Sequence, residues 1–191
     1  NLHEAARRAA ESLHLSAGQL DALQSLGECL NYNGYGETLA DLHFPPVELY
    51  RLLHCHVDPF TFIAEAPAFH QLRQGYAEDM AKAEELQPEM ATEACALYIL
   101  PDAPWSRRVS GSFSNRLAQS WPNRAHAILT RRSAGYTVSV RAPLAAPTGA
   151  DELCRRFDSG GGRKAAAGIN CLADAKVEEF VAAFRAAWGS V

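Results

Sequence analysis

The strongest constraint on the fold is a change in hydrophobic periodicity near residue 94. Before it, apolar residues recur at helical spacing between Pro, Gly and Asn breaks, whereas after it short apolar runs alternate with helical segments. Strands interleaved with helices are typical of a sheet covered by helices. We therefore expect an α/β (α+β) chain in two parts. Residues 1–93 are predicted to be a helical linker or connecting region, and residues 94–191 a small mixed β-sheet domain flanked by helices.

Local patterns place several helix boundaries in the first part. Ser16 and Gln19 form a capping-box pattern that starts a helix. Residues 31–36, Asn-Tyr-Asn-Gly-Tyr-Gly, break that helix because Asn and Gly adopt positive φ at low cost. A Pro-Pro pair at 45–46 opens another helix. Its apolar positions predict burial on most sides: Val47, Leu49, Tyr50, Leu52 and Leu53.

A β-hairpin is the clearest pattern in the second part. Residues 126–132 and 136–141 read as strands, and the Ser-Ala-Gly between them is a turn sequence. The second strand alternates, so Ser139 and Arg141 are predicted to share its polar face. Residues 96–100 are a short apolar run closed by Pro, which predicts a buried strand.

Two helices are expected to flank these strands. Ser112 is predicted to cap the first, and Asp174 the second. The second helix carries a wide apolar stripe, which predicts that it packs on the sheet. The stripe consists of Val177, Phe180, Val181, Phe184 and Trp188.

Composition narrows the classes of function. The 191 residues carry a net charge of −4, so no overall positive field attracts nucleic acid, and any anion site must be local. The five cysteines are widely spaced, which argues against a disulfide framework or a zinc knuckle and favours a reducing cytoplasm. No apolar run approaches the ~20 residues that a membrane span needs. The first residue is Asn1 rather than Met, and we expect a segment of a longer protein.

Residues 158–170 carry the most informative pattern for function. Three glycines stand in a row: Gly160, Gly161 and Gly162. Such a run can turn its amides inward around an anion, and Arg163 can clamp phosphate oxygens. The alternative is a flexible surface loop whose small residues pack a helix on the sheet. A Walker loop is absent, and the dinucleotide fingerprint is rejected because a helical segment ending at Phe157 precedes the glycines where a strand is needed.

This segment resembles the signature of the DHH-associated domain, subtype one, which usually reads Gly-Gly-Gly-His, two variable residues and Ala-Ala-Gly. The matching positions are Gly160, Gly161, Gly162, Ala166, Ala167 and Gly168. Residues 138–141, Val-Ser-Val-Arg, are similar to the Val-Ser-Leu-Arg strand of that family. The spacing between the two motifs also agrees, and the resemblance covers about residues 95–191.

The resemblance implies a domain that packs across a cleft from a separate DHH catalytic domain, which binds two divalent metals, usually manganese. In such proteins the C-terminal domain holds the nucleotide or its phosphates. The implied binding residues here are Ser139, Arg141, Gly160, Gly161, Gly162 and Arg163. No catalytic residue, metal ligand or cofactor is expected within this chain, because it contains neither Asp-x-Asp nor Asp-His-His.

We therefore expect the nucleic-acid or nucleotide phosphate-binding C-terminal domain of a manganese-dependent phosphoesterase, a hydrolase that is inactive as this segment. Its partners would be a nucleotide or short oligonucleotide and the DHH domain. However, Arg163 stands where most hydrolase members have His, and Arg cannot shuttle a proton. The related module of alanyl-tRNA synthetases also carries Arg near this point, so an RNA-binding module is an alternative. A dimerisation domain, forming a homodimer through the helices of 1–93, is another.

Two further clusters carry weaker patterns. The His-Cys-His triplet at 54–56 lies near Asp58, but side chains two apart on a helix point in nearly opposite directions, so packing or surface roles are expected. Arg107 and Arg108 near Trp105 could line a nucleic-acid groove, although solvated surface positions are the simpler interpretation.

Overall fold

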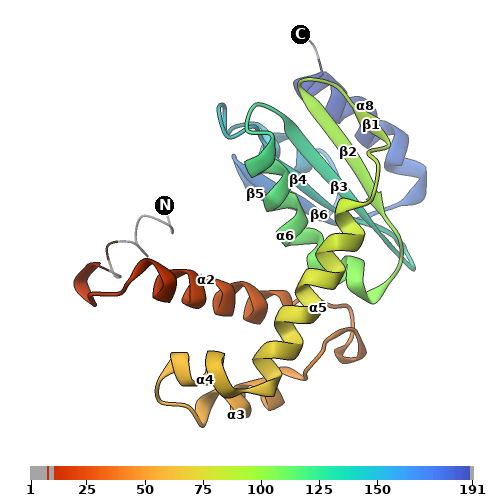
Figure 1. The fold of residues 1–191 in the computed structure, drawn as a ribbon. Helices are drawn as coiled ribbons and strands as arrows, with labels where there is room; N and C mark the ends of the chain where they lie inside the picture. Colours follow the sequence, from red (N-terminus) through yellow and green to blue (C-terminus); the bar gives the residue numbers. More distant parts are fainter. Residues whose placement is uncertain (1–7, 9–10, 190–191) are drawn as a thin grey trace. The chain divides into compact units, whose positions relative to one another are not determined.

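The structure, a computed structural model, describes residue 8 and residues 11–189 (Figure 1). Its contacts divide the chain into two units, Asn1–Glu78 and Asp79–Val191. Each unit has a hydrophobic core of its own. Within the described residues, no helix is long and apolar enough to cross a membrane. All five cysteines are free thiols.

The first unit is helical, and its first boundary follows the sequence. Ser16 caps α2 (Ala17–Tyr32): its Oγ accepts a hydrogen bond from Gln19 N–H at 3.3 Å, and Gln19 Oε1 accepts one from Ser16 N–H at 2.9 Å. This is the predicted capping box. The elements that follow are a short 3-10 turn and three helices: η1 (Leu39–Asp41), α3 (Pro46–His54), α4 (Pro59–Glu65) and α5 (Pro67–Glu84), which continues into the second unit.

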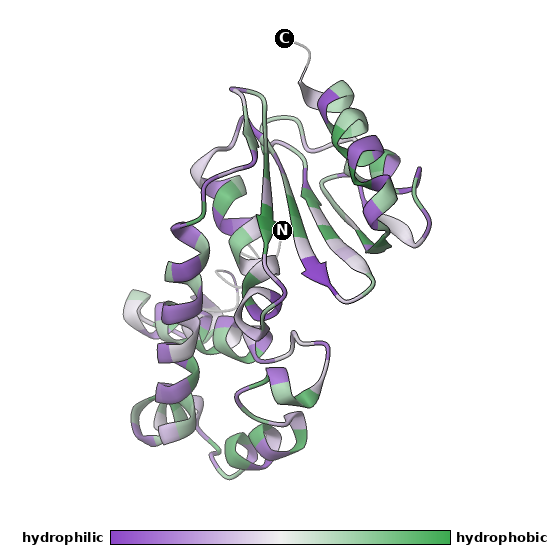
Figure 2. Ribbon diagram, turned by 90° about the vertical axis from the view of Figure 1, so that its right-hand side faces the viewer, coloured by the Kyte–Doolittle hydropathy of each residue, from purple (hydrophilic) through white to green (hydrophobic). Residues whose placement is uncertain are grey.

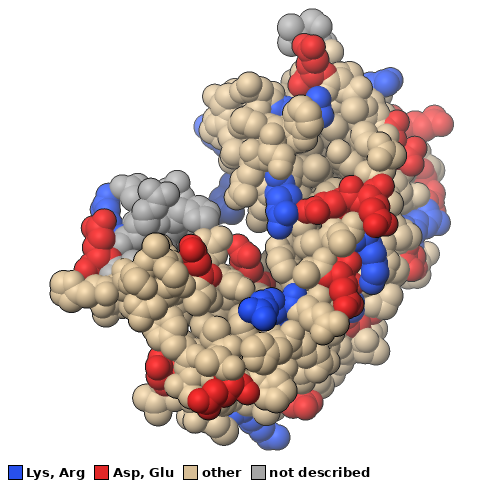
Figure 3. Space-filling view, in the orientation of Figure 1, with Lys and Arg blue, Asp and Glu red and all other residues tan. Residues whose placement is uncertain are grey.

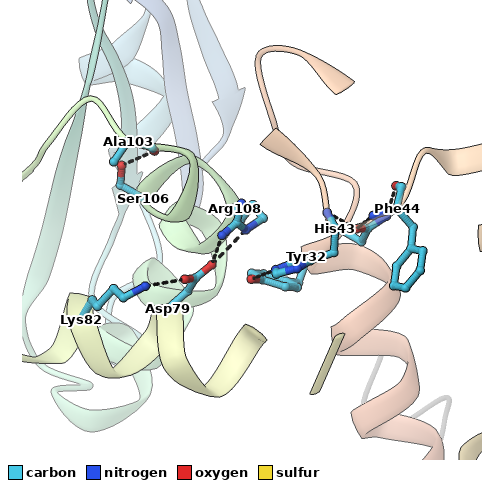
Figure 4. Close-up of polar contacts among 9 residues, drawn as sticks. Tyr32, His43, Phe44, Asp79, Lys82, Ala103, Ser106 and Arg108 are labelled. Atoms are coloured by element: carbon cyan, nitrogen blue, oxygen red, sulfur yellow. Dashed lines mark hydrogen bonds and ion pairs between the residues drawn. The ribbon is translucent and has the colours of Figure 1, made fainter. Parts of the chain in front are cut away.

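Buried polar side chains hold the segment that follows the predicted break at 31–36. Asn33 is 2% exposed, and its Oδ1 accepts from the backbone N–H groups of His43 and Phe44 at 3.0 and 3.1 Å. The Tyr32 hydroxyl lies 2.7 Å from His43 Nε2 (Figure 4). Because each of these buried groups has a partner, the chain can leave α2 without the cost of unsatisfied polar atoms.

The helix α3 is less buried than its apolar positions predict. Leu49 is buried, but Val47 and Tyr50 are 62% and 61% exposed. The prediction of burial on most sides is therefore wrong. An apolar run shows which side chains could be buried. How many of them are buried depends on how many other elements pack against the helix.

A six-stranded mixed sheet forms the centre of the second unit, in the order β1-β2-β3-β4-β6-β5. Only β2 and β3 pair in parallel. The predicted hairpin is confirmed, because Arg132 pairs with Gly135 and the register continues to the pair of His126 and Arg141. The strands are β1 (Met90–Ala91), β2 (Cys95–Leu100), β3 (Ala125–Arg132), β4 (Gly135–Arg141), β5 (Gly160–Arg163) and β6 (Ala166–Leu172).

Helices cover both faces of this sheet (Figures 1 and 2), which confirms the expected α/β (α+β) class. The helix α6 (Pro104–Ser120) lies on one face, and α7 (Ala150–Cys154) and α8 (Val177–Trp188) lie on the other. The larger core lies on the side of α7 and α8, where Val138 and Val140 meet Phe180 and Phe184. Apolar residues predominate along the central strands in Figure 2.

Two helix starts differ from the sequence expectation. The helix α6 begins at Pro104, so Ser112 lies inside it rather than at its cap. Proline is favoured at the first helical position because its missing N–H has no role there. Asp174 opens the 3-10 turn η2 (Asp174–Lys176) and pairs with Arg131, while α8 starts at Val177. A polar residue near a helix start can pair with another side chain instead of capping the helix, as Asp174 does with Arg131.

Candidate phosphate-binding site

The glycine run is a strand, not a loop. Gly160–Arg163 forms β5, the edge strand that pairs antiparallel with β6. The expected inward-facing nest of three consecutive amides is therefore wrong, because backbone amides alternate in direction along an antiparallel strand. Residues of low strand propensity adopt this conformation because β6 supplies the pairing partner.

The alternation leaves one outward amide in the run for a ligand. Asn170 N–H donates to Ser159 O at 3.3 Å, so the pair of Ser159 and Asn170 is hydrogen-bonded. The backbone N–H groups of Gly161 and Arg163 then also point toward β6, while the N–H of Gly162 points outward from the sheet edge. Gly160 N–H points outward as well, but it donates to Phe157 O at 3.0 Å.

The register brings four of the six predicted residues to one face. Ser139 pairs with Gly168, and Gly168 pairs with Gly161. Two residues further along β4, Arg141 pairs with Ala166, and Ala166 pairs with Arg163. Directly opposite residues in a sheet point to the same face. We call these four residues the anion face: Ser139, Arg141, Gly161 and Arg163. Gly160 and Gly162 alternate to the opposite face.

The floor of the anion face is made of small residues. The strand β6 separates β4 from β5 and contributes Gly168 and Ala166 to this face. Adjacent strands lie ~4.8 Å apart, so Arg141 and Arg163 are separated by about 10 Å across Ala166. Two long guanidinium side chains at that separation can converge on one tetrahedral anion lying on a floor without bulky side chains.

The helix α6 orients Arg141. Arg141 Nε donates to Asn115 Oδ1 at 3.0 Å, and its Nη1 donates to Ser139 Oγ at 2.9 Å. Ser114, which is 1% exposed, places its Oγ 3.1 Å from Ser139 Oγ. Sequence reasoning missed Ser114 and Asn115. No local pattern identifies them, because they meet β4 only through the packing of α6 on the sheet.

Arg163 has a different environment. Its side chain is exposed, and no described acidic residue pairs with it. An exposed guanidinium keeps its hydration until a ligand arrives, so ion-pair energy is not lost on binding. The anion face thus combines one arginine oriented by its neighbours with one that extends into solvent.

The glycines differ in what the fold requires of them. A Cβ at Gly160 would lie 1.8 Å from Cys154 O, and one at Gly162 would lie 2.5 Å from Ala167 Cα at a φ of +143°. A Cβ at Gly161 meets no atom within 4 Å. Within the described chain, contacts therefore require glycine at 160 and 162 but not at 161.

His126 lies next to this site on β3, opposite Arg141. It is 1% exposed, and neither ring nitrogen has a hydrogen-bond partner within the described chain. Burial and then the charge of Arg124 lower its pKa from 6.5 to about 4, and the backbone of Arg124 opposes this shift only in part. His126 is therefore neutral at pH 7, and arginines supply the positive charge beside it.

The other candidate clusters do not form a binding site. Arg107 pairs with Asp102, and Arg108 pairs with the buried carboxylate of Asp79 at 2.6 Å (Figure 4). In the part of the chain that the structure describes, no three His, Cys, Asp or Glu side chains gather as a metal site would require. Acidic and basic side chains are mixed over the surface seen in Figure 3, with no extended basic patch on that view. A local anion site is the arrangement that this charge distribution allows.

No family model matches the sequence, and no curated protein matches it. Similar solved structures exist. Exonuclease RecJ bound to manganese matches with a TM-score of 0.58 and 20% identity over 94% of this chain and 44% of that chain. RecJ from Thermus thermophilus with Mg²⁺ gives 0.55 and 21%, covering 85% of this chain and 28% of that one. PggH, a pGpG-specific phosphodiesterase from Vibrio cholerae, gives 0.56 and 14%, covering 83% and 55%.

These likenesses establish the architecture. The chain spans 28% to 55% of the length of those proteins, and the TM-scores of 0.55 to 0.58 show a shared fold at identities of 14% to 21%. Over most of its length, this chain has the fold found in structures of RecJ and of a pGpG-specific phosphodiesterase.

Proposed function

We propose that residues 94–191 are a DHH-associated domain, subtype one, that binds the phosphate of a nucleotide or short oligonucleotide through the anion face. Hydrolysis would take place in a DHH catalytic domain outside this sequence, where two metals, expected to be manganese, activate the nucleophile. The observation that carries the proposal is the strand register, which aligns Ser139 and Arg141 with Gly161 and Arg163 on one face.

The chemistry of the anion face suits a phosphate. Arg141 is held by Asn115 and Ser139, so little side-chain entropy is lost when it binds an anion. Each charge-assisted hydrogen bond from a guanidinium contributes ~1.5–3 kcal/mol. At Gly161 the anion can approach the backbone directly, and at the sheet edge the outward N–H of Gly162 is a further donor.

Removal of either arginine should weaken phosphate binding by about tenfold or more, the equivalent of one charge-assisted hydrogen bond. The measurement is calorimetric titration of a 5′-phosphorylated dinucleotide into the parent chain, Arg141→Ala and Arg163→Ala. Arg156→Ala is the matched control, because it removes the same charge from an exposed position on the side of α7. Affinity should also fall with salt. If both arginine variants bind as tightly as Arg156→Ala, the proposed site is wrong.

A pair of glycine variants separates ligand approach from folding. Gly161→Val should leave the fold intact, because no atom lies within 4 Å of its Cβ position, and should abolish binding by covering the floor of the anion face. Gly160→Val should unfold or strongly destabilise the domain, because of its clash with Cys154 O. Folded Gly161→Val with undiminished binding would show that the ligand does not approach the backbone there.

The chain by itself should not hydrolyse phosphodiesters when manganese or magnesium is added. It contains no Asp-x-Asp or Asp-His-His segment, and a two-metal centre needs several such ligands. The measurement is release of nitrophenol from bis(4-nitrophenyl) phosphate by purified chain with each metal. Metal-dependent turnover that persists through further purification, and that is lost in variants of this chain, would contradict the proposal.

A further inference from the structure

A pocket lies on the other side of α6 from its contacts with β4. This pocket, of about 290 Å³, is bounded by the C-terminal half of α6, by β2 and by residues at and after the end of α5. Its principal lining residues are Tyr98, Phe113, Leu117, Trp121, Arg116 and Glu84. All of these belong to the second unit. The volume is near the lower end for small-molecule sites.

Three aromatic side chains contribute to the lining. Tyr98 and Phe113 make an edge-to-face contact with ring centroids 5.5 Å apart. Trp121 is 51% exposed, unusually high for so large an apolar side chain. The guanidinium of Arg124 covers its ring at 4.3 Å from the centroid and is not part of the pocket lining. An indole backed by a cation and open to a pocket is a surface on which another ring can stack.

Tyr98 contributes a hydroxyl to the lining of the pocket. The residue as a whole is 8% exposed, but its hydroxyl oxygen is not among the buried polar atoms that lack a partner, and no hydrogen bond joins it to another described residue. Burial raises the pKa of Tyr98, so the hydroxyl stays protonated and able to donate. A hydroxyl that solvent can reach can exchange its water for a hydrogen bond to a ligand.

An ion pair marks the rim. Arg116 Nη1 lies 2.8 Å from Glu84 Oε1, and both side chains are about half exposed. The pocket therefore combines aromatic side chains with the hydroxyls of Tyr98 and Ser120 and with one ion pair. Aromatic rings beside hydrogen-bonding groups suit a flat heteroaromatic ring that itself carries hydrogen-bonding atoms.

We propose that this pocket binds a planar heteroaromatic ring, a nucleobase by chemical class, which stacks on Trp121 and hydrogen-bonds to the hydroxyl of Tyr98. The pocket is distinct from the anion face. Ser114 and Asn115 contact β4 on one side of α6, whereas Phe113 and Leu117 line the pocket toward β2. The proposal uses no phosphate contact and does not rest on the proposed function.

Nucleosides without phosphate test it directly. Adenosine, guanosine, cytidine and uridine are titrated into ¹⁵N-labelled chain, and the indole N–H signals of the three tryptophans are followed by NMR. At least one nucleoside should shift the Trp121 signal in a saturable way, while ribose should not. Trp121→Ala should weaken binding about fivefold or more, since stacking is the main contact. Trp105→Ala, in the first turn of α6 and outside the pocket lining, is the matched control and should bind as the parent does.

Tyr98→Phe separates a ligand role from a structural one. Because the hydroxyl has no partner within the described chain, its removal should leave thermal stability unchanged. It should nevertheless weaken nucleoside binding by about three- to tenfold, the equivalent of one hydrogen bond. Equal binding by parent, Trp121→Ala and Tyr98→Phe would overturn the proposal, as would the absence of a saturable shift with all four nucleosides at millimolar concentration.

Two further outcomes separate this proposal from the phosphate site. Arg141→Ala and Arg163→Ala should keep the parent affinity for nucleosides. If only phosphorylated nucleotides bind, and these variants lose that binding, the anion face is supported and the aromatic pocket is wrong. If the Trp121 signal instead shifts with protein concentration alone, the surface is an interface between copies of the chain, which also overturns the proposal.

Discussion

Replacing Phe184 with alanine should lower the free energy of unfolding by about 3–5 kcal/mol. Its side chain is fully buried and stacks on Phe180, with ring centroids 6.2 Å apart. Both rings belong to the core between the sheet and α8, so truncation leaves a cavity that close-packed neighbours fill only in part. Denaturant unfolding of the parent and the variant, followed by circular dichroism, gives the difference.

Trp188→Ala is the matched control on the same stripe of α8. The sequence pattern places Trp188 with the buried residues, but it lies at the last position of the helix and is partly exposed. Its ring packs over Gly149, where a Cβ would lie 3.2 Å away. We therefore expect a smaller loss than for Phe184→Ala. A larger loss for Trp188→Ala would show that the core is centred on the end of α8.

Lowering the pH from 7 to 5 should cost about 2 kcal/mol of stability through His126 alone. Its folded pKa is about 4, against 6.5 for the free side chain, because burial disfavours the charged ring. The unfolded chain therefore binds a proton below pH 6.5, whereas the folded chain does so only below about 4. This contribution to stability is complete above pH 6.5 and is lost as the pH falls toward 4.

His126→Leu is the variant that isolates this effect. Leucine occupies the buried position without a titrating group, so the variant should lose about 2 kcal/mol less than the parent between pH 7 and 5. It should also be as stable as the parent or more so at pH 7, because two unsatisfied ring nitrogens are removed. Denaturant midpoints at pH 7, 6 and 5 provide the comparison. An identical pH dependence of the two proteins would exclude His126 as the titrating group.

The sequence by itself determined the features that depend on a few neighbouring residues. The capping box at Ser16 and Gln19, the hairpin around 133–135 and the apolar stripe of α8 all follow from local geometry and appear in the structure. The helical first part and the mixed sheet of the second follow from hydrophobic periodicity. Such patterns can be recognised in a sequence because backbone hydrogen bonding and side-chain direction repeat with fixed periods.

Only the tertiary structure decided how the predicted site residues lie. The glycines read as a loop because they lack intrinsic strand propensity, and their pairing with β6 made them an edge strand. The same pairing set Gly161 beside Gly168 and directed Gly160 toward α7. Three identical residues in a row give no sequence signal that tells these two positions apart. The contacts of Ser114 and Asn115 with β4 likewise depend on how α6 packs on the sheet. Long-range packing selects among conformations that the local sequence leaves close in energy, so register and burial were settled by the fold.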